Sequence, residues 1–332
     1  MEWDPSRFFR TEDSPSPYAL LVLNQPINEK AFRALREHAS FIICADGAAN
    51  YFYEMMKGHG TESTELPDKI VGDLDSIRPA VKEHYEKLGV SIYKYQDQYL
   101  PDFAKCLKYI NANATEIIAS SHQQPATGNT TSTNSENAQS AADAEQNQKL
   151  DIVILGGLGG RVDQAFSQIH YLYMMSQTQQ EMLETKARRV NEDDDHSRSY
   201  IFKQASGGQL YLVSEASITF ILQQGKNTIH TPGTKRPDLP QAESRSEDES
   251  RKRKRDEEKE PEYFFEENIG IIPLTGPTSI TTEGFEWDVQ DWHTSIGGGP
   301  LSTSNHIRAD VVSVEAPVPI LFTVELAERF RR

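Results

Sequence analysis

The sequence predicts an α/β fold, with a parallel-sheet nucleotide-binding domain followed by a C-terminal antiparallel β-sandwich domain. Units of buried strand, turn and helix repeat with the same polarity over the first two thirds of the chain. Aspartates follow several of these strands directly. After residue 214 the pattern changes to short alternating segments separated by Gly, Pro and Thr. We therefore expect an α/β domain over residues 18–213 and a β-sandwich domain over 214–332.

Continuous apolar runs predict the strands of the first domain. The runs at 18–23, 41–45 and 150–155 are typical of strands buried on both faces. Further strands are expected at 69–71, 90–95 and 210–213, and helices at 28–39, 48–56, 79–88, 102–110 and from about 164 to 175. A strand–helix alternation of this kind predicts parallel strands joined by crossover helices.

The second domain should contain strands at 217–222, 227–230, 269–274, 279–282 and 311–314. Four polar segments lie outside the predicted elements. Residues 1–17 are expected to be a disordered N-terminus, without the apolar core of a signal peptide. Residues 111–149 and 176–200 should be polar insertions in the first domain, and 233–262 a charged insertion in the second.

Composition excludes several classes of protein. The formal net charge of −16 argues against a general nucleic-acid binder and against binding to an anionic membrane. The two cysteines, Cys44 and Cys106, lie in apolar segments and cannot form a disulfide framework. No apolar run is long enough to span a bilayer, so we expect a cytoplasmic protein. The basic run 251–255 could permit nuclear entry, but its acidic flanks favour a solvated loop.

The central motif is the sequence GDLDS at residues 72–76. Gly72 ends a strand, and Asp73 and Asp75 follow with the i, i+2 spacing that puts both carboxylates on one side of an extended chain. Paired carboxylates favour a cation, and Mg²⁺ is the usual one beside substrate phosphates. The alternative is a polar turn that caps the next helix. Because Asp46 and Asp97 also follow strands, and ligands bind at the carboxyl ends of parallel strands, the metal site is the better interpretation.

A glycine-rich turn follows the strand at 150–155. Residues 156–160 do not form a P-loop, and Val162 stands where a dinucleotide fingerprint would need its third glycine. Backbone N–H groups in such a turn, together with Arg161, can hold a phosphate, and Asp163 and Gln164 add a carboxylate and an amide. The alternative is a tight turn whose glycines serve packing only.

Trp287 and the segment 301–305 suggest a site for a flat ring. An exposed Trp with Ser and Asn nearby can hold a heteroaromatic ring by stacking and hydrogen bonds. A core Trp of the β domain is the alternative.

The motifs together resemble the eukaryotic thiamine pyrophosphokinase family and indicate a fungal member. They are LVLNQP (21–26), CADGAAN (44–50), PDKIVGDLDSIRP (67–79), DFAKCLKYI (102–110), LGGLGGRVDQ (155–164), TTEGFEWDV (281–289) and LSTSNHI (301–307). The resemblance implies transfer of the pyrophosphoryl group of ATP to the hydroxyl of thiamine, with Mg²⁺, giving thiamine diphosphate and AMP. It also implies a homodimer with active sites at the subunit interface.

The resemblance assigns roles to individual residues. The metal site would comprise Asp46, Asp73 and Asp75, and the catalytic carboxylates would be Asp73, Asp75, Asp102 and Asp163. ATP and its phosphates would be bound by Asn24, Gln25, Asp46, Gly47, Ser76, Gly159, Arg161 and Gln164, and thiamine by Trp287, Ser302, Ser304 and Asn305. Two positions depart from the family pattern: Pro101 replaces the usual Thr before Asp102, and Tyr99 replaces an Asp.

The residues themselves leave two other functions open. One is a different Mg²⁺-dependent nucleotide hydrolase or transferase that uses the same carboxylates. The other is a non-catalytic nuclear interaction protein that uses the basic run 251–255.

Overall fold

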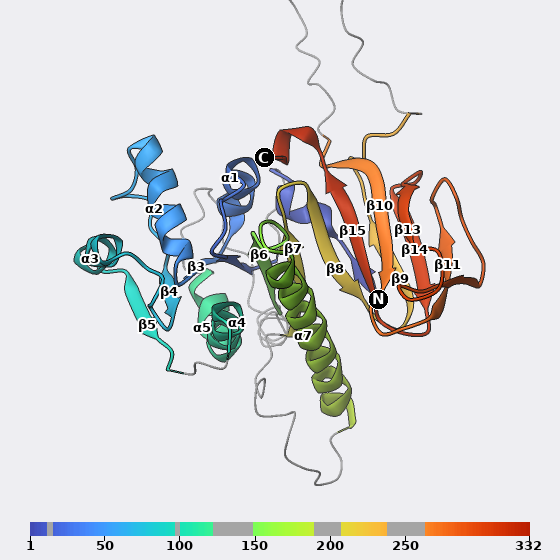
Figure 1. Cartoon of the computed structure of the whole chain (residues 1–332), viewed down its shortest axis with the longest axis horizontal. Coiled ribbons are helices and arrows are strands. Elements are labelled where there is room, and N and C mark those ends of the chain that lie inside the picture. Colours follow the sequence, from blue (N-terminus) through green and yellow to red (C-terminus); the bar gives the residue numbers. More distant parts are fainter. Residues whose placement is uncertain (12–15, 97–99, 122–148, 189–206, 238–262) are drawn as a thin grey trace, which may run out of the picture. The chain divides into compact units, whose positions relative to one another are not determined.

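The computed structural model describes residues 1–11, 16–96, 100–121, 149–188, 207–237 and 263–332 (Figure 1). The chain divides into two compact units, which we call the α/β unit (Glu12–Glu215) and the β unit (Met1–Thr11 with Ala216–Arg332). The predicted parallel α/β domain and antiparallel β domain are both present.

Six parallel strands form the sheet of the α/β unit, in the order β7-β6-β2-β3-β4-β5. Their bounds are β2 Tyr18–Val22, β3 Phe41–Ala45, β4 Lys69–Gly72, β5 Ser91–Lys94, β6 Leu150–Leu155 and β7 Gly207–Val213. Every residue of β2 and β6 is buried, as their continuous apolar sequences predict. Parallel pairing brings the carboxyl ends of these strands to one edge of the sheet.

The helices of this unit are α1 Glu29–His38, α2 Ala48–His59, α3 Pro79–Lys87, α4 Asp102–Ala112, α5 Ala114–Ser121 and α7 Val162–Arg188. Helix α4 packs on β3 and β4, and α7 packs on β7. Two helices extend into the predicted insertions. Helix α7 continues to Arg188, well past the predicted end near 175, and α5 occupies part of the segment 111–149. Because Ile117 of α5 is buried, the first residues of that segment belong to the folded unit.

The β unit contains two sheets. One has the antiparallel order β13-β10-β15-β8 and the other the order β1-β9-β14-β11-β12. Their bounds are β1 Glu2–Trp3, β8 Ser217–Leu222, β9 Gly225–His230, β10 Phe265–Pro273, β11 Thr278–Glu283, β12 Trp292–Thr294, β13 Ser302–His306, β14 Val311–Ala316 and β15 Ile320–Leu326. The rings of Trp3 and Phe220 stack at 4.9 Å and those of Phe285 and Phe322 lie 6.3 Å apart, so aromatic side chains join the two sheets.

The N-terminal segment differs from the sequence prediction. The expectation of disorder over 1–17 is wrong for residues 1–11, because β1 pairs with β9 and a 3₁₀ helix spans Pro5–Phe9. The indole Nε1 of Trp3 donates a hydrogen bond to Asn227 Oδ1 at 3.0 Å, and the ring of Phe9 lies 4.7 Å from that of Phe330. Burial of these aromatic side chains and of Phe8 stabilises the segment.

Parts of the charged segment 233–262 are also folded. Thr234 is buried and bridges to Phe265, and Arg236 forms an ion pair with Asp310 at 3.2 Å. Residues 122–148, 189–206 and 238–262, the last of which include the basic run 251–255, lie outside the described residues. Among the helices that the structure describes, none has the length and apolar character needed to cross a bilayer.

Candidate active site

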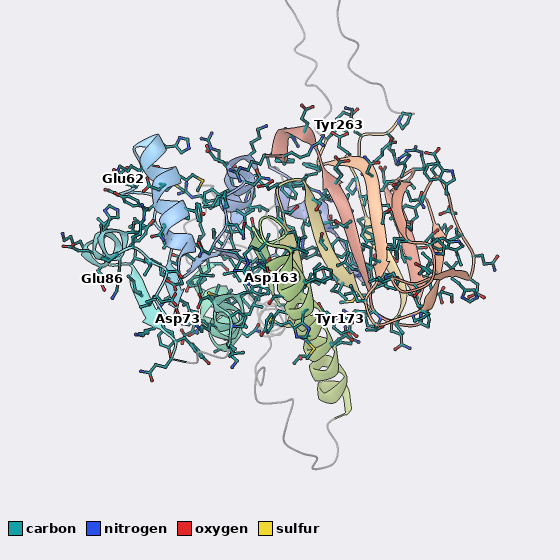
Figure 2. The ribbon with its side chains drawn as sticks, viewed as in Figure 1. Glu62, Asp73, Glu86, Asp163, Tyr173 and Tyr263 are labelled. Carbon is teal, nitrogen blue, oxygen red and sulfur yellow. The ribbon has the colours of Figure 1, made fainter. Side chains whose placement is uncertain are left out.

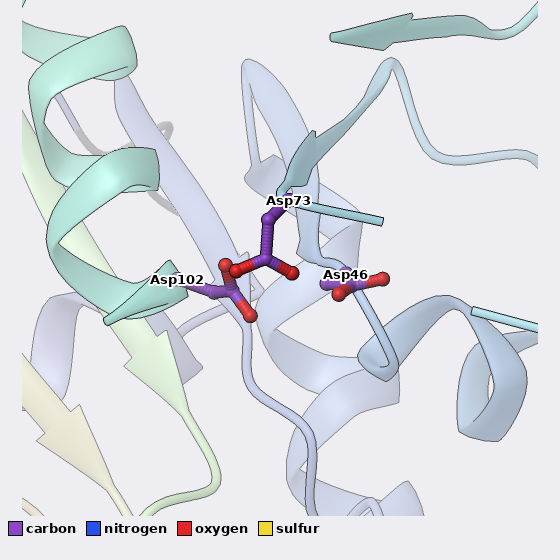
Figure 3. A group of neighbouring side chains, drawn as sticks. All are labelled: Asp46, Asp73 and Asp102. Carbon is purple, nitrogen blue, oxygen red and sulfur yellow. The ribbon is translucent and has the colours of Figure 1, made fainter. Parts of the chain in front are cut away.

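Three carboxylates meet at the carboxyl edge of the parallel sheet (Figure 3). Asp46 directly follows β3, Asp73 directly follows β4, and Asp102 is the first residue of α4. One oxygen from each lies within 4.8 Å of the others. We call these residues the carboxylate cluster. The parallel strands β3 and β4 place Asp46 and Asp73 at the same edge, and the packing of α4 on both strands adds Asp102.

Asp46 is held rigidly at the base of the cluster. Its φ of 40° lies in the left-handed region, and its carboxylate accepts hydrogen bonds from the backbone N–H groups of Ser76, at 3.2 Å, and Ile77, at 2.9 Å. A Cβ atom at position 72 would lie 2.5 Å from the Asp46 Cβ, so only glycine fits there. Burial, together with the negative charges of Asp102 and Asp73, raises the pKa of Asp46 to about 6.

Lys105 is a member of the site that the sequence analysis missed. Its side chain is 1% exposed, and its ammonium lies 2.8 Å from Asp73 Oδ2 and 2.8 Å from Asp102 Oδ1. Hydrogen bonding to Lys105 lowers the pKa of Asp73. Burial alone would lower the pKa of Lys105, but its bonds to Asp102 and Asp73 outweigh that effect, and its pKa is raised. The sequence did offer one indication of this contact, because Lys105 follows Asp102 with the i, i+3 spacing that brings two side chains together on a helix.

The other residues of the GDLDS motif are arranged differently from the prediction. Asp75 is not part of the carboxylate cluster, because Leu74 has a φ of 65° and the chain is therefore not extended between the two aspartates. The carboxylate of Asp75 is exposed and accepts a hydrogen bond from Ser76 Oγ at 2.7 Å. The backbone N–H of Ser76 is directed to Asp46. The structure thus brings Asp102, rather than Asp75, together with Asp46 and Asp73.

Pro101, one of the two departures from the family pattern, does not displace Asp102. Pro101 occupies the N-cap of α4 with extended backbone, and its carbonyl oxygen accepts the N–H of Lys105 at 3.1 Å. Asp97 and Tyr99 lie outside the described residues.

The glycine-rich turn between β6 and α7 adopts backbone conformations that glycine alone adopts readily. Gly156, Gly157 and Gly160 have positive φ, and a Cβ at Gly157 would lie 1.7 Å from Gln168 Oε1. Gln25 lies against the turn, since its Oε1 is 3.0 Å from a Cβ built at Gly160 and 3.9 Å from one built at Gly159. Positions 156, 157 and 160 therefore favour glycine through their backbone conformation.

Arg161 and Asp163 lie at the start of α7, where Figure 2 labels Asp163. They form a two-bond ion pair with distances of 3.1 and 2.6 Å, and both side chains are largely exposed, as is Gln164. The bond to Arg161 lowers the pKa of Asp163. In this arrangement the Arg161 guanidinium is occupied by Asp163 and remains accessible from solvent.

Asn24 and Gly47 lie side by side after strands β2 and β3. Asn24 is exposed, and its Nδ2 lies 2.5 Å from a Cβ built at Gly47, so a larger residue at position 47 would displace the Asn24 side chain. Both residues are at the edge of the sheet that carries the carboxylate cluster.

The predicted ring-binding residues lie in the β unit. Trp287 is 54% exposed and its ring centroid is 5.1 Å from that of His306, so it is not a core residue of the described structure. Ser302, Ser304 and Asn305 lie on β13; Ser302 is half-buried, Ser304 exposed and Asn305 buried. The exposed indole supports the ring-binding interpretation over the core interpretation.

Comparison with known proteins gives the family. The model for the thiamin pyrophosphokinase catalytic domain matches residues 32–183, which include the carboxylate cluster and the glycine-rich turn. The model for the thiamin pyrophosphokinase vitamin B1 binding domain matches residues 254–321, which include Trp287 and β13. Both models describe parts of the same family, and they match in the order that the sequence motifs predict.

Curated relatives and solved structures are similar to this chain over most of its length and carry the same family name. Thiamine pyrophosphokinase 1 of Oryza sativa subsp. japonica is 25% identical over 329 residues, which cover 95% of this chain and 89% of the relative. Thiamine pyrophosphokinase of Saccharomyces cerevisiae is 25% identical, with 92% and 85% covered. The structure of thiamin pyrophosphokinase from Candida albicans superposes with a TM-score of 0.67 at 23% identity, covering 98% of this chain and 92% of that chain, and supports the fold. The chain therefore belongs to the thiamin pyrophosphokinase family.

Proposed function

We propose that this protein is a thiamine diphosphokinase that uses ATP and Mg²⁺. The observation that carries the proposal is the carboxylate cluster of Asp46, Asp73 and Asp102 at the carboxyl edge of a parallel sheet, in a chain that matches both domain models of the family. The exposed Trp287 in the region of the vitamin B1 binding model supports thiamine as the acceptor.

The donor set fits a magnesium ion. Three carboxylate oxygens within 4.8 Å of one another supply the hard ligands that Mg²⁺ prefers. Burial, with the negative charges of Asp102 and Asp73 adding to it, raises the pKa of Asp46, and a divalent cation would favour the ionised carboxylate there. When bound, Mg²⁺ would offset the negative charge of the triphosphate.

The residues of the chain would mainly position the substrates and neutralise charge. Lys105 would neutralise Asp73 and Asp102, and Arg161, released from Asp163, would bind a phosphate with its two parallel N–H groups. The thiamine hydroxyl oxygen bonds to the β-phosphorus of ATP, the bond from that phosphorus to the AMP oxygen breaks, and the hydroxyl proton passes to a carboxylate. Asp102 and Asp163 are the two candidate acceptors.

The assay of this function uses ATP, Mg²⁺ and thiamine, with AMP and thiamine diphosphate as the measured products. We expect both products in equal amounts, and neither with the Asp73→Asn protein. AMP formed without thiamine would instead indicate a nucleotide hydrolase, and absence of turnover would favour a non-catalytic interaction protein.

We further propose that the protein is a homodimer whose active sites each combine two chains, because C₂ pairs are the commonest closed assemblies and the family resemblance favours a shared site. Inactive Asp73→Asn chains mixed with inactive Trp287→Ala chains should then recover activity, since one site of each heterodimer draws intact residues from different chains. Failure to recover activity despite demonstrated subunit exchange would place each site within one chain.

We propose a cytoplasmic location, with nuclear entry through the basic run 251–255 as the alternative. A fluorescent fusion of the full chain should remain outside the nucleus. Nuclear accumulation that is lost when residues 251–255 are replaced by Ala would favour the alternative.

A further inference from the structure

Trp287 is a large exposed side chain on a loop, yet its backbone is firmly held. The loop 284–289 follows β11, and 54% of the Trp287 surface is open to solvent. An exposed aromatic residue on a mobile loop would lose conformational freedom when a ligand stacked on it, which would weaken binding. The hydrogen bonds of this loop show how that loss is avoided.

Asn305 fixes the loop at Trp287 itself. Its Oδ1 accepts the backbone N–H of Trp287 at 3.2 Å and that of His306 at 2.8 Å, and its Nδ2 donates to the carbonyl oxygen of Trp287 at 2.9 Å. Asn305 as a whole is 7% exposed. Asn305 thus uses both ends of its amide on the backbone, which differs from the ligand-binding role that the sequence motif implies.

Asp288 fixes the same loop from within. Its Oδ2 accepts the N–H of Gly284 at 3.0 Å, and its Oδ1 accepts the N–H of Phe285 at 3.1 Å and the hydroxyl of Thr282 at 3.2 Å. The Thr282 hydroxyl in turn accepts the N–H of Val289 at 3.0 Å. The carboxylate therefore closes a ring of hydrogen bonds across the base of the loop.

We propose that Asn305 and Asp288 are positioning residues for thiamine, which hold Trp287 in its ring-binding orientation before the substrate arrives. Asn305 acts through the Trp287 backbone and does not contact thiamine. This inference rests on the proposed function. Because hydrogen bonds within the chain itself hold the loop, little conformational entropy is lost on binding, and loss of either residue weakens thiamine binding without changing the chemical step.

The kinetic test compares Asn305→Ala and Asp288→Ala with the wild-type protein. We expect the KM for thiamine to rise roughly tenfold in each variant, with kcat at saturating thiamine within about twofold and the KM for ATP unchanged. Asp288→Asn keeps an acceptor for Phe285 but directs an N–H group at Gly284, so its KM should be intermediate. Asn268→Ala is the matched control, because Asn268 lies on the neighbouring β10 and donates to the Glu325 side chain at 2.6 Å.

A second measurement separates positioning from direct contact. In protein labelled with 5-fluorotryptophan, the ¹⁹F signal of Trp287, assigned with Trp287→Phe, should change in linewidth in Asn305→Ala and Asp288→Ala but not in Asn268→Ala. A raised KM with an unchanged Trp287 signal would make Asn305 a direct ligand and overturn the inference, as would an unchanged KM. If the wild-type protein did not phosphorylate thiamine, the proposed function would fail. The inference would then be judged by the ¹⁹F signal and by thiamine titration of that signal.

Discussion

The carboxylate cluster predicts that the free energy of unfolding of the α/β unit falls as the pH rises from 5 to 8. Asp46 is fully buried and its pKa is raised to about 6, so the folded protein holds this proton more tightly than the unfolded chain, whose value is 3.8. The contribution is therefore greatest below the unfolded value and is lost as pH rises through 6. At 1.36 kcal/mol per pKa unit, the free energy of unfolding should fall by up to about 1.4 kcal/mol between pH 5 and pH 8.

Asp46→Asn removes this titration. The amide keeps one acceptor for the two backbone N–H groups of Ser76 and Ile77, and the unpaired group costs about 1–3 kcal/mol at every pH. The stability difference from wild type should therefore be larger at pH 5 than at pH 8, by about 1.4 kcal/mol. Urea unfolding in EDTA, followed by circular dichroism at 222 nm, measures it.

Asp75→Asn is the control, since it removes an aspartate outside the cluster. Mg²⁺ should stabilise the wild-type protein more at pH 8 than at pH 5, because metal and proton compete for the same oxygens. Wild-type and Asp46→Asn proteins whose stabilities change in parallel from pH 5 to pH 8 in EDTA would refute the reasoning.

Three further predictions concern other parts of the molecule. Lys105→Met should lower the free energy of unfolding in EDTA by about 1–3 kcal/mol, measured by urea titration. It should also lower kcat/KM at least about 100-fold, measured from initial rates. Wild-type values of both quantities would exclude Lys105 from the site. Trp3→Ala should destabilise the β unit by about 3–5 kcal/mol in calorimetry, and Trp3→Phe by less. Deleting 122–148 should leave thiamine turnover within about threefold, whereas a deletion that starts at 115 also removes buried Ile117 and should reduce stability.

The sequence was sufficient for the framework of the α/β unit. Continuous apolar runs identify β2, β3 and β6, and strand polarity places Asp46 and Asp73 at one edge of the sheet. It was not sufficient for the third carboxylate. The prediction of Asp75 assumed an extended chain, and the left-handed Leu74 breaks that assumption. The position of Asp102 depends on how α4 packs against the strands, which is a tertiary contact.

The β unit was harder to predict, because its strands depend on partners far away in the sequence. Strand β15 pairs with both β8 and β10, but its sequence follows a Pro-containing turn and was not recognised. Strands β12 and β13 are short and polar, so their residues carry little apolar periodicity. The N-terminal segment was assigned to disorder from its polar average, although Trp3, Phe8 and Phe9 are all buried.

The pairing of β1 with β9 has a consequence for synthesis of the chain. Glu2 lies opposite Thr228, so the first strand must wait for more than two hundred residues to be translated before its partner exists. At about 5–20 residues per second the delay is about 10–45 s. The α/β unit lies entirely within that interval of sequence and can fold while residues 1–11 have no β unit to join. Completion of the β unit is therefore a late, non-local step in which residues 1–11 join residues 216–332.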